Sequence, residues 1–323
     1  MAELELRELK ESEFPIWDKF VESSPQGNIY STTQWLKIIE SSTDYKGHIL
    51  AIFDKLNNIV AGCLFFSIKK VFEIIHPPPL TPFTTILFEN KRTNKLSKVE
   101  SFQEEVIEKL EKKFLDYDYV LLLLHPSVQD LRPFTFRKWK ESIHYTYLID
   151  ISDASRSWEN LNESKRRGIK MAQEYGIRIE NSDDINSFYD LYKKYFEGRD
   201  FKKLVQKELI KKILNLDNSK LYVAKKDGSN IAFLLIVFDK SFIYTLLTAS
   251  EPEFKKYQSL SLLVWEIIKE NPKKIPKIDF VGANISSISN FKRGFSTELV
   301  PYYSVEKCPS KLVNFLVKLR KSF

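Results

Sequence analysis

The sequence predicts an α/β protein with mixed sheets, built from two consecutive copies of one unit. Apolar runs with strand-like alternation are interleaved with segments in which apolar residues recur at helical spacing. The order of these segments in the first half is repeated in the second half, although the residues differ. With 323 residues, 43% of them hydrophobic, the chain is long enough for two packed domains. We expect these domains at residues 1–152 and 153–323.

The first half runs strand, helix, helix, three strands, helix, strand, short aromatic segment and strand. The strands are expected at Glu3–Leu9, Ile49–Asp54, Ile59–Ser67, Val71–Ile75, Tyr119–Leu124 and Tyr145–Ile151. The helices are expected at Glu13–Glu22, Thr33–Ser41 and Asn94–Leu115, and the aromatic segment at Arg132–Trp139.

The second half gives the same order. Strands are expected at Ile177–Glu180, Lys220–Lys225, Ile231–Phe238, Phe242–Thr248, Lys277–Val281 and Leu299–Glu306. Helices are expected at Asp184–Phe196, Phe201–Leu214, Ser259–Glu270, Ser286–Lys292 and Pro309–Lys321. Turn residues at Asp227-Gly228 and Asp239-Lys240-Ser241 separate the three central strands, which should therefore form an antiparallel meander.

Composition excludes several classes of protein. No run of eighteen apolar residues is present, so no transmembrane helix is expected. The acidic start, Met1–Glu5, lacks the pattern of a signal peptide, and we expect a soluble, cytoplasmic protein. The two cysteines and four histidines show no metal-ligand or disulfide spacing, so no metal is expected.

Charge is unevenly divided between the two halves. Residues 1–150 hold 19 basic and 22 acidic side chains, whereas residues 151–323 hold 31 and 21. A basic second half suggests a polyanionic or phosphorylated ligand, although lysines that only solvate helix faces would give the same count.

Five stretches resemble the Fem family of peptidyltransferases and the GNAT-like acyltransferases allied to it. They are Asn28–Lys37, Pro77–Phe83, Arg132-Pro133-Phe134, Lys165–Ile177, and Asp279–Gly282 taken together with Asn290–Phe295. The resemblance spans nearly the whole chain and implies two tandem GNAT-like domains, an acceptor side in the first and a donor side in the second. The long coiled-coil arm of some Fem members is missing, because Asp183–Asn218 holds only two ordinary helices.

The resemblance implies transfer of an acyl or aminoacyl group to an amine. The donor ester or thioester is already activated, so the enzyme needs to position the amine and stabilise the oxyanion, with no covalent intermediate. The Phe291-Lys292 pair matches the Fem pair at the active cleft, which implies a catalytic role for both residues. The alternative is that Lys292 extends from a helix end that Gly294 caps.

The donor site implied by the resemblance lies at the helix that begins near Ser259. The phosphate-binding motif of GNAT enzymes has glycines here, whereas this chain reads Lys255–Leu263 without them. Lys256, Gln258 and Ser259, with Ser259 as the N-cap, are predicted to bind the donor, as are Arg166 and Arg167 of the basic stretch Lys165–Lys170. An ordinary capped helix and a solvated basic face are the alternatives.

For the acceptor, the resemblance implies Trp35 and Lys37 as binding residues, with a core position in its helix as the alternative for Trp35. Tyr303 alternates with Tyr302 on the last strand and is a further candidate for acceptor binding. No residue is identified as the general base. Acyl-CoA or aminoacyl-tRNA is expected as co-substrate, with no permanently bound cofactor. The acceptor is expected to be a phosphorylated small molecule or glycan precursor, such as a cell-envelope precursor or an amino sugar, and tRNA is a further candidate partner. A non-catalytic tandem module that binds a glycan precursor or RNA is the competing hypothesis.

Overall fold

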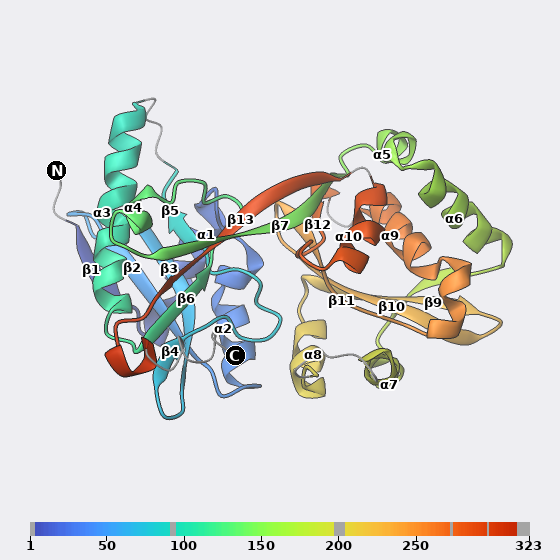
Figure 1. Cartoon of the computed structure of the whole chain (residues 1–323), viewed down its shortest axis with the longest axis horizontal. Helices are drawn as coiled ribbons and strands as arrows, with labels where there is room; N and C mark the ends of the chain where they lie inside the picture. The colour runs from blue at the N-terminus through green and yellow to red at the C-terminus, as the bar shows by residue number, and fades with distance from the viewer. Residues whose placement is uncertain (1–3, 91–94, 197–203, 272–273, 296, 315–323) are drawn as a thin grey trace. The chain divides into compact units, whose positions relative to one another are not determined.

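The computed structural model describes residues 4–90, 95–196, 204–271, 274–295 and 297–314. Two compact units make up the chain (Figure 1). Unit 1 comprises residues 1–144 and 301–323, and unit 2 comprises residues 145–300. The division expected at residues 152 and 153 therefore differs from these units chiefly in the C-terminal segment.

The expected repeat of element order is confirmed. In the first half it runs β1 (Glu5–Glu8), α1 (Phe14–Ser23), α2 (Thr33–Glu40), β2 (Lys46–Phe53), β3 (Ile59–Lys69), β4 (Glu73–Ile75), α3 (Leu96–Phe114), β6 (Tyr119–Leu123), α4 (Arg132–Thr135) and β7 (Lys140–Asp150). In the second it runs β8 (Arg178–Ser182), α7 (Ile185–Phe196), α8 (Lys207–Leu214), β9 (Ser219–Lys226), β10 (Ser229–Phe238), β11 (Phe242–Ser250), α9 (Ser259–Glu270), β12 (Lys277–Asp279), α10 (Ser286–Lys292) and β13 (Glu298–Lys307).

Besides short 3-10 helices, one strand and two α-helices of the described residues lie outside the repeat. The short strand β5 (Ile86–Phe88) pairs with β3, and the helices α5 (Ala154–Asn160) and α6 (Glu163–Glu174) link the halves. The helix expected at Phe201–Leu214 begins at Lys207 among the described residues, and most of the one expected at Pro309–Lys321 lies outside them.

Each unit has a mixed sheet. Unit 1 has the order β1-β2-β3-β4-β6-β13 and unit 2 the order β7-β12-β11-β10-β9-β8. In both, an antiparallel meander is followed by one parallel pair, β4 with β6 and β11 with β12. The last strand of each repeat is exchanged, because β7 pairs with β12 of unit 2 and β13 pairs with β6 of unit 1.

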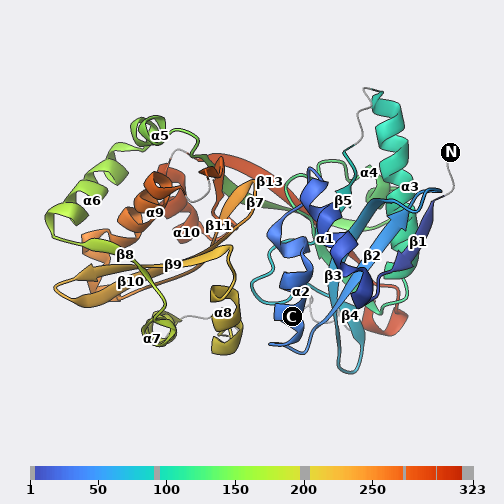
Figure 2. The ribbon, with the colours of Figure 1, turned by 180° about the vertical axis from the view of Figure 1, so that it is seen from behind.

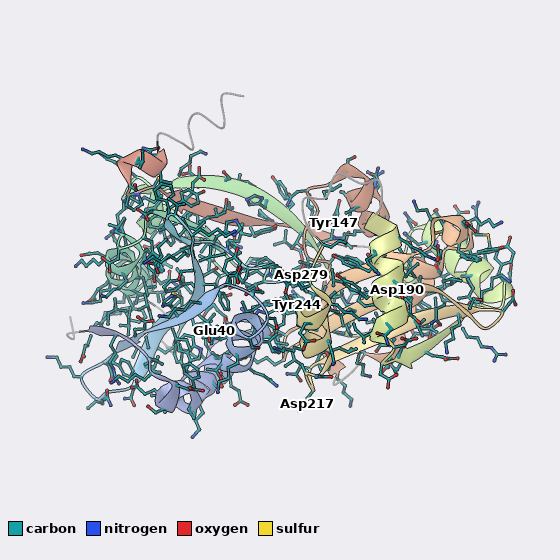
Figure 3. All side chains as sticks on the ribbon, turned by 90° about the horizontal axis from the view of Figure 1, so that it is seen from below. Glu40, Tyr147, Asp190, Asp217, Tyr244 and Asp279 are labelled. Carbon is teal, nitrogen blue, oxygen red and sulfur yellow. The ribbon has the colours of Figure 1, made fainter. Side chains whose placement is uncertain are left out.

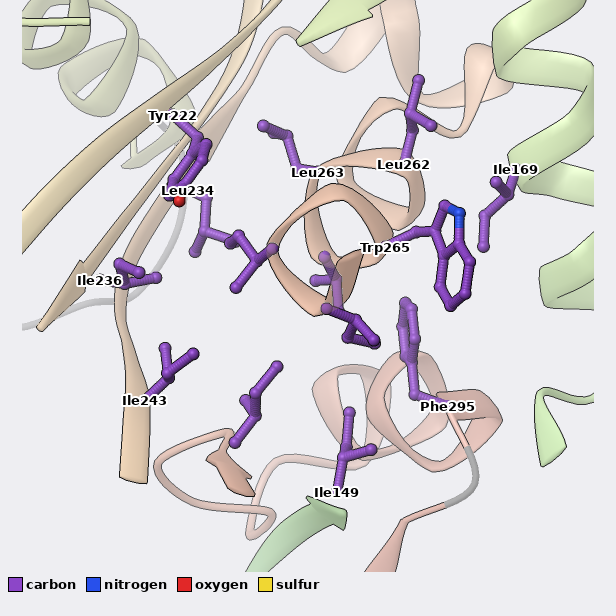
Figure 4. Packing of buried hydrophobic residues seen from close by; sticks show 14 of the residues in the cluster. Ile149, Ile169, Tyr222, Leu234, Ile236, Ile243, Leu262, Leu263, Trp265 and Phe295 are labelled. Carbon is purple, nitrogen blue, oxygen red and sulfur yellow. The ribbon is translucent and has the colours of Figure 1, made fainter. Parts of the chain in front are cut away.

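Helices cover both faces of the unit 2 sheet. α9 and α6 lie on one face and α7 and α8 on the other, as the two opposite views show (Figures 1 and 2). Trp265 of α9 packs with Ile169 of α6 on one side and Phe295 on the other (Figure 4). This core fixes α6 against α9, so side chains between the two helices have defined neighbours.

Unit 1 has its own core under α3. It includes Phe65 of β3, Phe114 of α3 and Trp139, all of them fully or nearly fully buried. Among the described residues, no helix combines the length and the apolar character that crossing a bilayer requires.

Candidate functional site

A cavity of about 530 Å³ lies within unit 2. Its walls come from β11, the start of α9, the segment that follows β12, and α10. Four residues predicted for the site line it, namely Gln258, Ser259, Phe291 and Lys292. Among the described residues that line it, there is no histidine, cysteine, aspartate or glutamate.

The cavity begins where two parallel strands part. β11 pairs with β12 from Phe242 to Tyr244, and β12 ends at Asp279, opposite Tyr244. β11 continues to Ser250, and its residues Thr245, Leu246 and Thr248 line the cavity. Because the two strands separate, one edge of β11 faces the cavity. An extended ligand can form hydrogen bonds with backbone groups along such an edge.

The start of α9 forms the polar end of the cavity. Gln258 is the N-cap, in a left-handed conformation with φ 57° and ψ 27°, and Ser259 is the first helical residue. The prediction that Ser259 is the N-cap was therefore wrong by one position. The amides of the first turn of a helix, and its dipole, attract negative charge. Lys255 and the buried side chains of Ser250 and Ser261 also line the cavity.

Lys292 is held by backbone carbonyl groups. Its Nζ donates to Phe280 O and Gly282 O, both at 2.6 Å, and lies 3.5 Å from Val281 O. The C-cap of α10 is Arg293, so Gly294 does not occupy the cap position that the alternative reading of Lys292 gave it. Burial lowers the pKa of Lys292 to about 8, and the charge of Asp279 opposes this shift.

The backbone amides of the turn that follows β12 also have hydrogen-bond partners. Val281 N donates to Asp279 Oδ1 at 2.7 Å, Gly282 N donates to Thr146 Oγ1 at 3.0 Å, and Ala283 N donates to Tyr145 O at 2.6 Å. Val281 has φ 51°, a strained conformation for a β-branched residue. Lys292 and these acceptors therefore hold a strained turn that lines the cavity.

Asp279 is a buried carboxylate beneath this turn. It is 1% exposed, and Thr146 Oγ1 donates to its Oδ1 at 2.5 Å. Burial raises its pKa to about 6, against the hydrogen bonds from Thr146 and Val281. It pairs in register with Leu148 of β7, and Figure 3 shows it near Tyr147 and Tyr244.

Lys165 is a buried lysine, and sequence analysis did not single it out. It lies on α6, its side chain is 9% exposed, and its Nζ donates to Ser261 Oγ at 3.2 Å. The Nζ lies 3.5 Å from the ring centroid of Phe291 and 4.6 Å from that of Phe295. In the described part of the chain, no carboxylate forms an ion pair with it. Burial lowers the pKa of Lys165 to about 8.

Three other residues predicted for the donor site do not line the cavity. Arg166 Nη1 donates to the carbonyl of Glu159 at 2.7 Å, close to the start of its own helix. Arg167 pairs with Glu163 at 2.6 Å on an exposed surface. Lys256 is exposed, and its Nζ lies 5.0 Å from the ring centroid of Tyr257. Their roles in donor binding stay predictions.

The three residues predicted for the acceptor belong to unit 1. Trp35 is fully buried, and its Nε1 donates to Thr81 Oγ1 at 2.9 Å. Lys37 is exposed and pairs with Glu11 at 2.8 Å. Tyr303 lies on β13, where its carbonyl accepts a hydrogen bond from Leu124 N at 2.8 Å. These contacts account for their positions, and a role in acceptor binding remains a prediction.

Comparison with known proteins agrees with this architecture. Residues 159–293 match the sequence model of a family described as an acetyltransferase (GNAT) domain. This range contains the whole cavity lining and Lys165. A search of curated proteins finds no match.

Three solved structures with a similar fold cover nearly the whole chain. FemX matches 96% of this chain and 99% of its own, with 13% identity and a TM-score of 0.73. A tandem GNAT protein from the clavulanic acid biosynthesis pathway matches 95% and 99%, with 10% identity and a TM-score of 0.56. The C-terminal domain of a putative lysylphosphatidylglycerol synthetase from Agrobacterium fabrum matches 91% of each chain, with 12% identity and a TM-score of 0.56.

At such identities the likeness shows a shared fold, and it confirms the predicted tandem GNAT-like architecture. The family match adds the enzyme class for the unit that contains the cavity. The chain is an acyltransferase whose residues 159–293 match the acetyltransferase (GNAT) domain model, and its tandem fold is similar to that of FemX.

Proposed function

We propose that the chain is an N-acyltransferase that moves an acyl or aminoacyl group from an activated donor to an amine. The observation that carries this proposal is the cavity between the parted strands, with a helix N-terminus at its polar end and Lys292 in its wall. The acceptor is the amine of a phosphorylated small molecule or glycan precursor, such as a cell-envelope precursor or an amino sugar. The likeness to FemX, together with the sequence resemblance to Fem peptidyltransferases, supports this choice of acceptor.

The donor lies along β11. Beyond Tyr244 this strand has no register partner in β12, so its backbone can bind an extended arm as an added strand would. The phosphate end of the donor then meets the first amides of α9, close to Lys255. Coenzyme A thioesters and aminoacyl-tRNA esters both join a reactive carbonyl to a phosphate group, so both fit this outline. The basic second half of the chain supports a donor with several phosphates.

The chemistry is direct attack by the amine on the donor carbonyl. A carbon–nitrogen bond forms and the carbon–sulfur or carbon–oxygen bond breaks, so the leaving thiol or alcohol departs as the amine loses a proton. The serines and threonines of the lining have no histidine or carboxylate beside them in that lining, which supports transfer without an acyl-enzyme. The charge of Lys292, held in a partly buried position, stabilises the developing oxyanion.

Binding of each donor tests the proposal. We expect acetyl-CoA to bind the wild-type protein in isothermal titration calorimetry, with charged and uncharged tRNA as the second arm. The variant Thr248→Trp, which places an indole in the cavity, should abolish binding of either donor. Ser229→Trp, on an exposed position of β10 outside the lining, should leave it unchanged.

Each outcome decides one part of the proposal. Binding of acetyl-CoA identifies a thioester donor, and preference for charged over uncharged tRNA identifies an ester donor. If neither binds, or if Thr248→Trp binds as well as the wild type, the donor site is not this cavity. A protein that binds a glycan precursor or RNA and neither donor would support the non-catalytic hypothesis.

A further inference from the structure

Lys165 interrupts the apolar stripe of α6. The buried positions of this helix are Lys165, Gly168, Ile169 and Ala172, spaced at three, four and seven residues. This spacing defines one face of a helix, and that face packs against α9. The other members are apolar, and the rings of Phe291 and Phe295 surround the ammonium. An uncharged residue would satisfy the packing at lower desolvation cost.

The ammonium fixes the direction of a short hydrogen-bond chain. A protonated lysine has three donors and no acceptor, so Ser261 Oγ must accept from Lys165. The hydroxyl hydrogen of Ser261 is then free to donate to Gln258 Oε1, at 3.3 Å. A neutral or apolar residue at position 165 would impose no such direction.

Gln258 is held on two sides by this arrangement. A Cβ added at Gly168 would lie 3.0 Å from Gln258 Cγ and 3.3 Å from Oε1, so α6 packs closely on this side chain. The Oε1 atom faces α6 and Ser261, and no described residue accepts a hydrogen bond from Nε2. Gln258 lines the cavity, together with Ser250, whose 3% exposed side chain has an Oγ atom without a partner among the described residues.

We infer that Lys165 is a positioning residue that acts through Ser261 to turn the Gln258 amide nitrogen toward an oxygen of the bound donor. This inference rests on the proposed function, since the oxygen belongs to a phosphate or carbonyl group of the acyl donor at the start of α9. The positive charge of Lys165 also makes the electrostatic potential at the start of α9 more positive, because buried charges are screened less than exposed ones. The specific contact is that of Gln258, and Lys165 itself touches no ligand.

Affinity for coenzyme A gives the first test. Lys165→Met keeps the length of the side chain and removes the charge, and Ser261→Ala cuts the chain at its middle. Each should raise the Kd for coenzyme A about tenfold, the effect of losing one hydrogen bond to a charged group. The double variant should bind no more weakly than Lys165→Met alone, because Ser261 acts only in series with Lys165. Lys165→Arg, which keeps the charge and donates only, should recover part of the affinity.

Lys211→Met, an exposed lysine on α8, is the matched control and should bind as the wild type does. If coenzyme A does not bind the wild type, the same variants are compared with charged tRNA. Effects that add in the double variant, or a Lys165→Met protein with unchanged affinity, would overturn the inference.

A spectroscopic readout separates this inference from the donor proposal. In protein labelled with ¹⁵N-glutamine, Lys165→Met and Ser261→Ala should each move the Gln258 side-chain amide resonances, while Lys211→Met leaves them in place. A shift without any donor binding would contradict the proposed function and keep the positioning role. Resonances unchanged by Lys165→Met would refute the positioning role even if donors bind.

Discussion

Lys292 Nζ lies 2.6 Å from the carbonyl oxygen of Phe280, and both residues line the cavity. The ammonium also donates to Gly282, so it is fixed to the turn that follows β12. A charge fixed in this way needs no reorganisation when a negative charge develops nearby. The role that we propose for Lys292 is therefore electrostatic, since most of its hydrogen-bonding capacity is used by the protein.

Removal of this charge should reduce the rate of acyl transfer. Lys292→Met should lower kcat about a hundredfold, the scale of losing one preorganised group at an oxyanion. It should also cost about 1 to 3 kcal/mol of stability, because the carbonyl groups of Phe280 and Gly282 lose their partner. Steady-state kinetics and urea unfolding measure the two effects. An unchanged kcat in a folded variant would exclude the catalytic role of Lys292.

Two comparisons sharpen this experiment. Lys292→Arg should not restore kcat, because a planar guanidinium cannot place one nitrogen among carbonyl groups that converge on a single point. Lys269→Met, a surface lysine of α9 that pairs with Glu266, should match the wild type in both measurements.

Because Gly294 has no side chain, the side chain of Lys165 can occupy the space beside it. A Cβ at this position would lie 2.8 Å from Lys165 Cγ and 2.9 Å from Lys165 Cε. Gly294→Ala should therefore destabilise the protein by about 1 to 3 kcal/mol, the usual cost of overpacking. Combining it with Lys165→Ala should recover part of that loss, since the clashing atoms are then absent.

Urea unfolding of the two single variants and the double variant gives the coupling. Additive losses would show that the side chain of Lys165 does not occupy the space beside Gly294. We expect the double variant to lose less stability than the sum of the two single losses.

Local patterns in the sequence were enough to predict the order of elements. Hydrophobic periodicity is a property of neighbouring residues, and all ten elements of each repeat lie close to their expected places. The exchange of β7 and β13 was not predictable in this way, because alternation shows that a segment is a strand and not which strand it pairs with. The last strand was accordingly assigned to the second domain.

The site was predictable where its residues mark the ends of elements. Gln258 and Ser259 begin a helix and Lys292 ends one, and the structure brings these residues to one cavity. Lys165 was counted with Arg166 and Arg167 as one basic run, although helical spacing from Ile169 and Ala172 places only Lys165 on the buried face. Its aromatic neighbours come from a distant part of the chain, so no local pattern could predict them.

Stability should rise with pH above neutrality because of two lysines, the buried Lys165 and the partly buried Lys292. Burial lowers the pKa of Lys165 to about 8, whereas an exposed lysine titrates near 10.5. Between these values the unfolded state binds more protons than the folded state, so a rise in pH favours folding. The wild type should gain about 1 to 3 kcal/mol per lysine between pH 8 and pH 10.5.

Lys165→Met should lack the part of this pH-dependent increase in stability that Lys165 contributes. Urea unfolding at several pH values measures the increase. Lys211→Met should retain the full wild-type slope. A Lys165→Met protein with the wild-type slope would mean that Lys165 keeps its ordinary pKa in the folded state.

Asp279 provides the corresponding test on the acid side. Its pKa is about 6 in the folded protein and about 3.8 for an exposed carboxyl group, so the folded state binds more protons between these values. Stability contributed by this group therefore increases as pH falls from 6 toward 4, and at pH 7.5 the buried charge destabilises the fold. Asp279→Asn keeps an oxygen that can accept from Thr146 and Val281, and should stabilise the protein by about 1 to 3 kcal/mol at pH 7.5.

The same substitution should also change the titration of Lys292. The Asp279 charge raises the pKa of Lys292, so Asp279→Asn should move the alkaline limb of the kcat/KM profile to lower pH. Asp217→Asn, at an exposed site of unit 2, is the control and should shift neither stability nor profile (Figure 3). Loss of stability in Asp279→Asn, with the alkaline limb in place, would mean that the carboxylate is held by its partners more strongly than burial disfavours it.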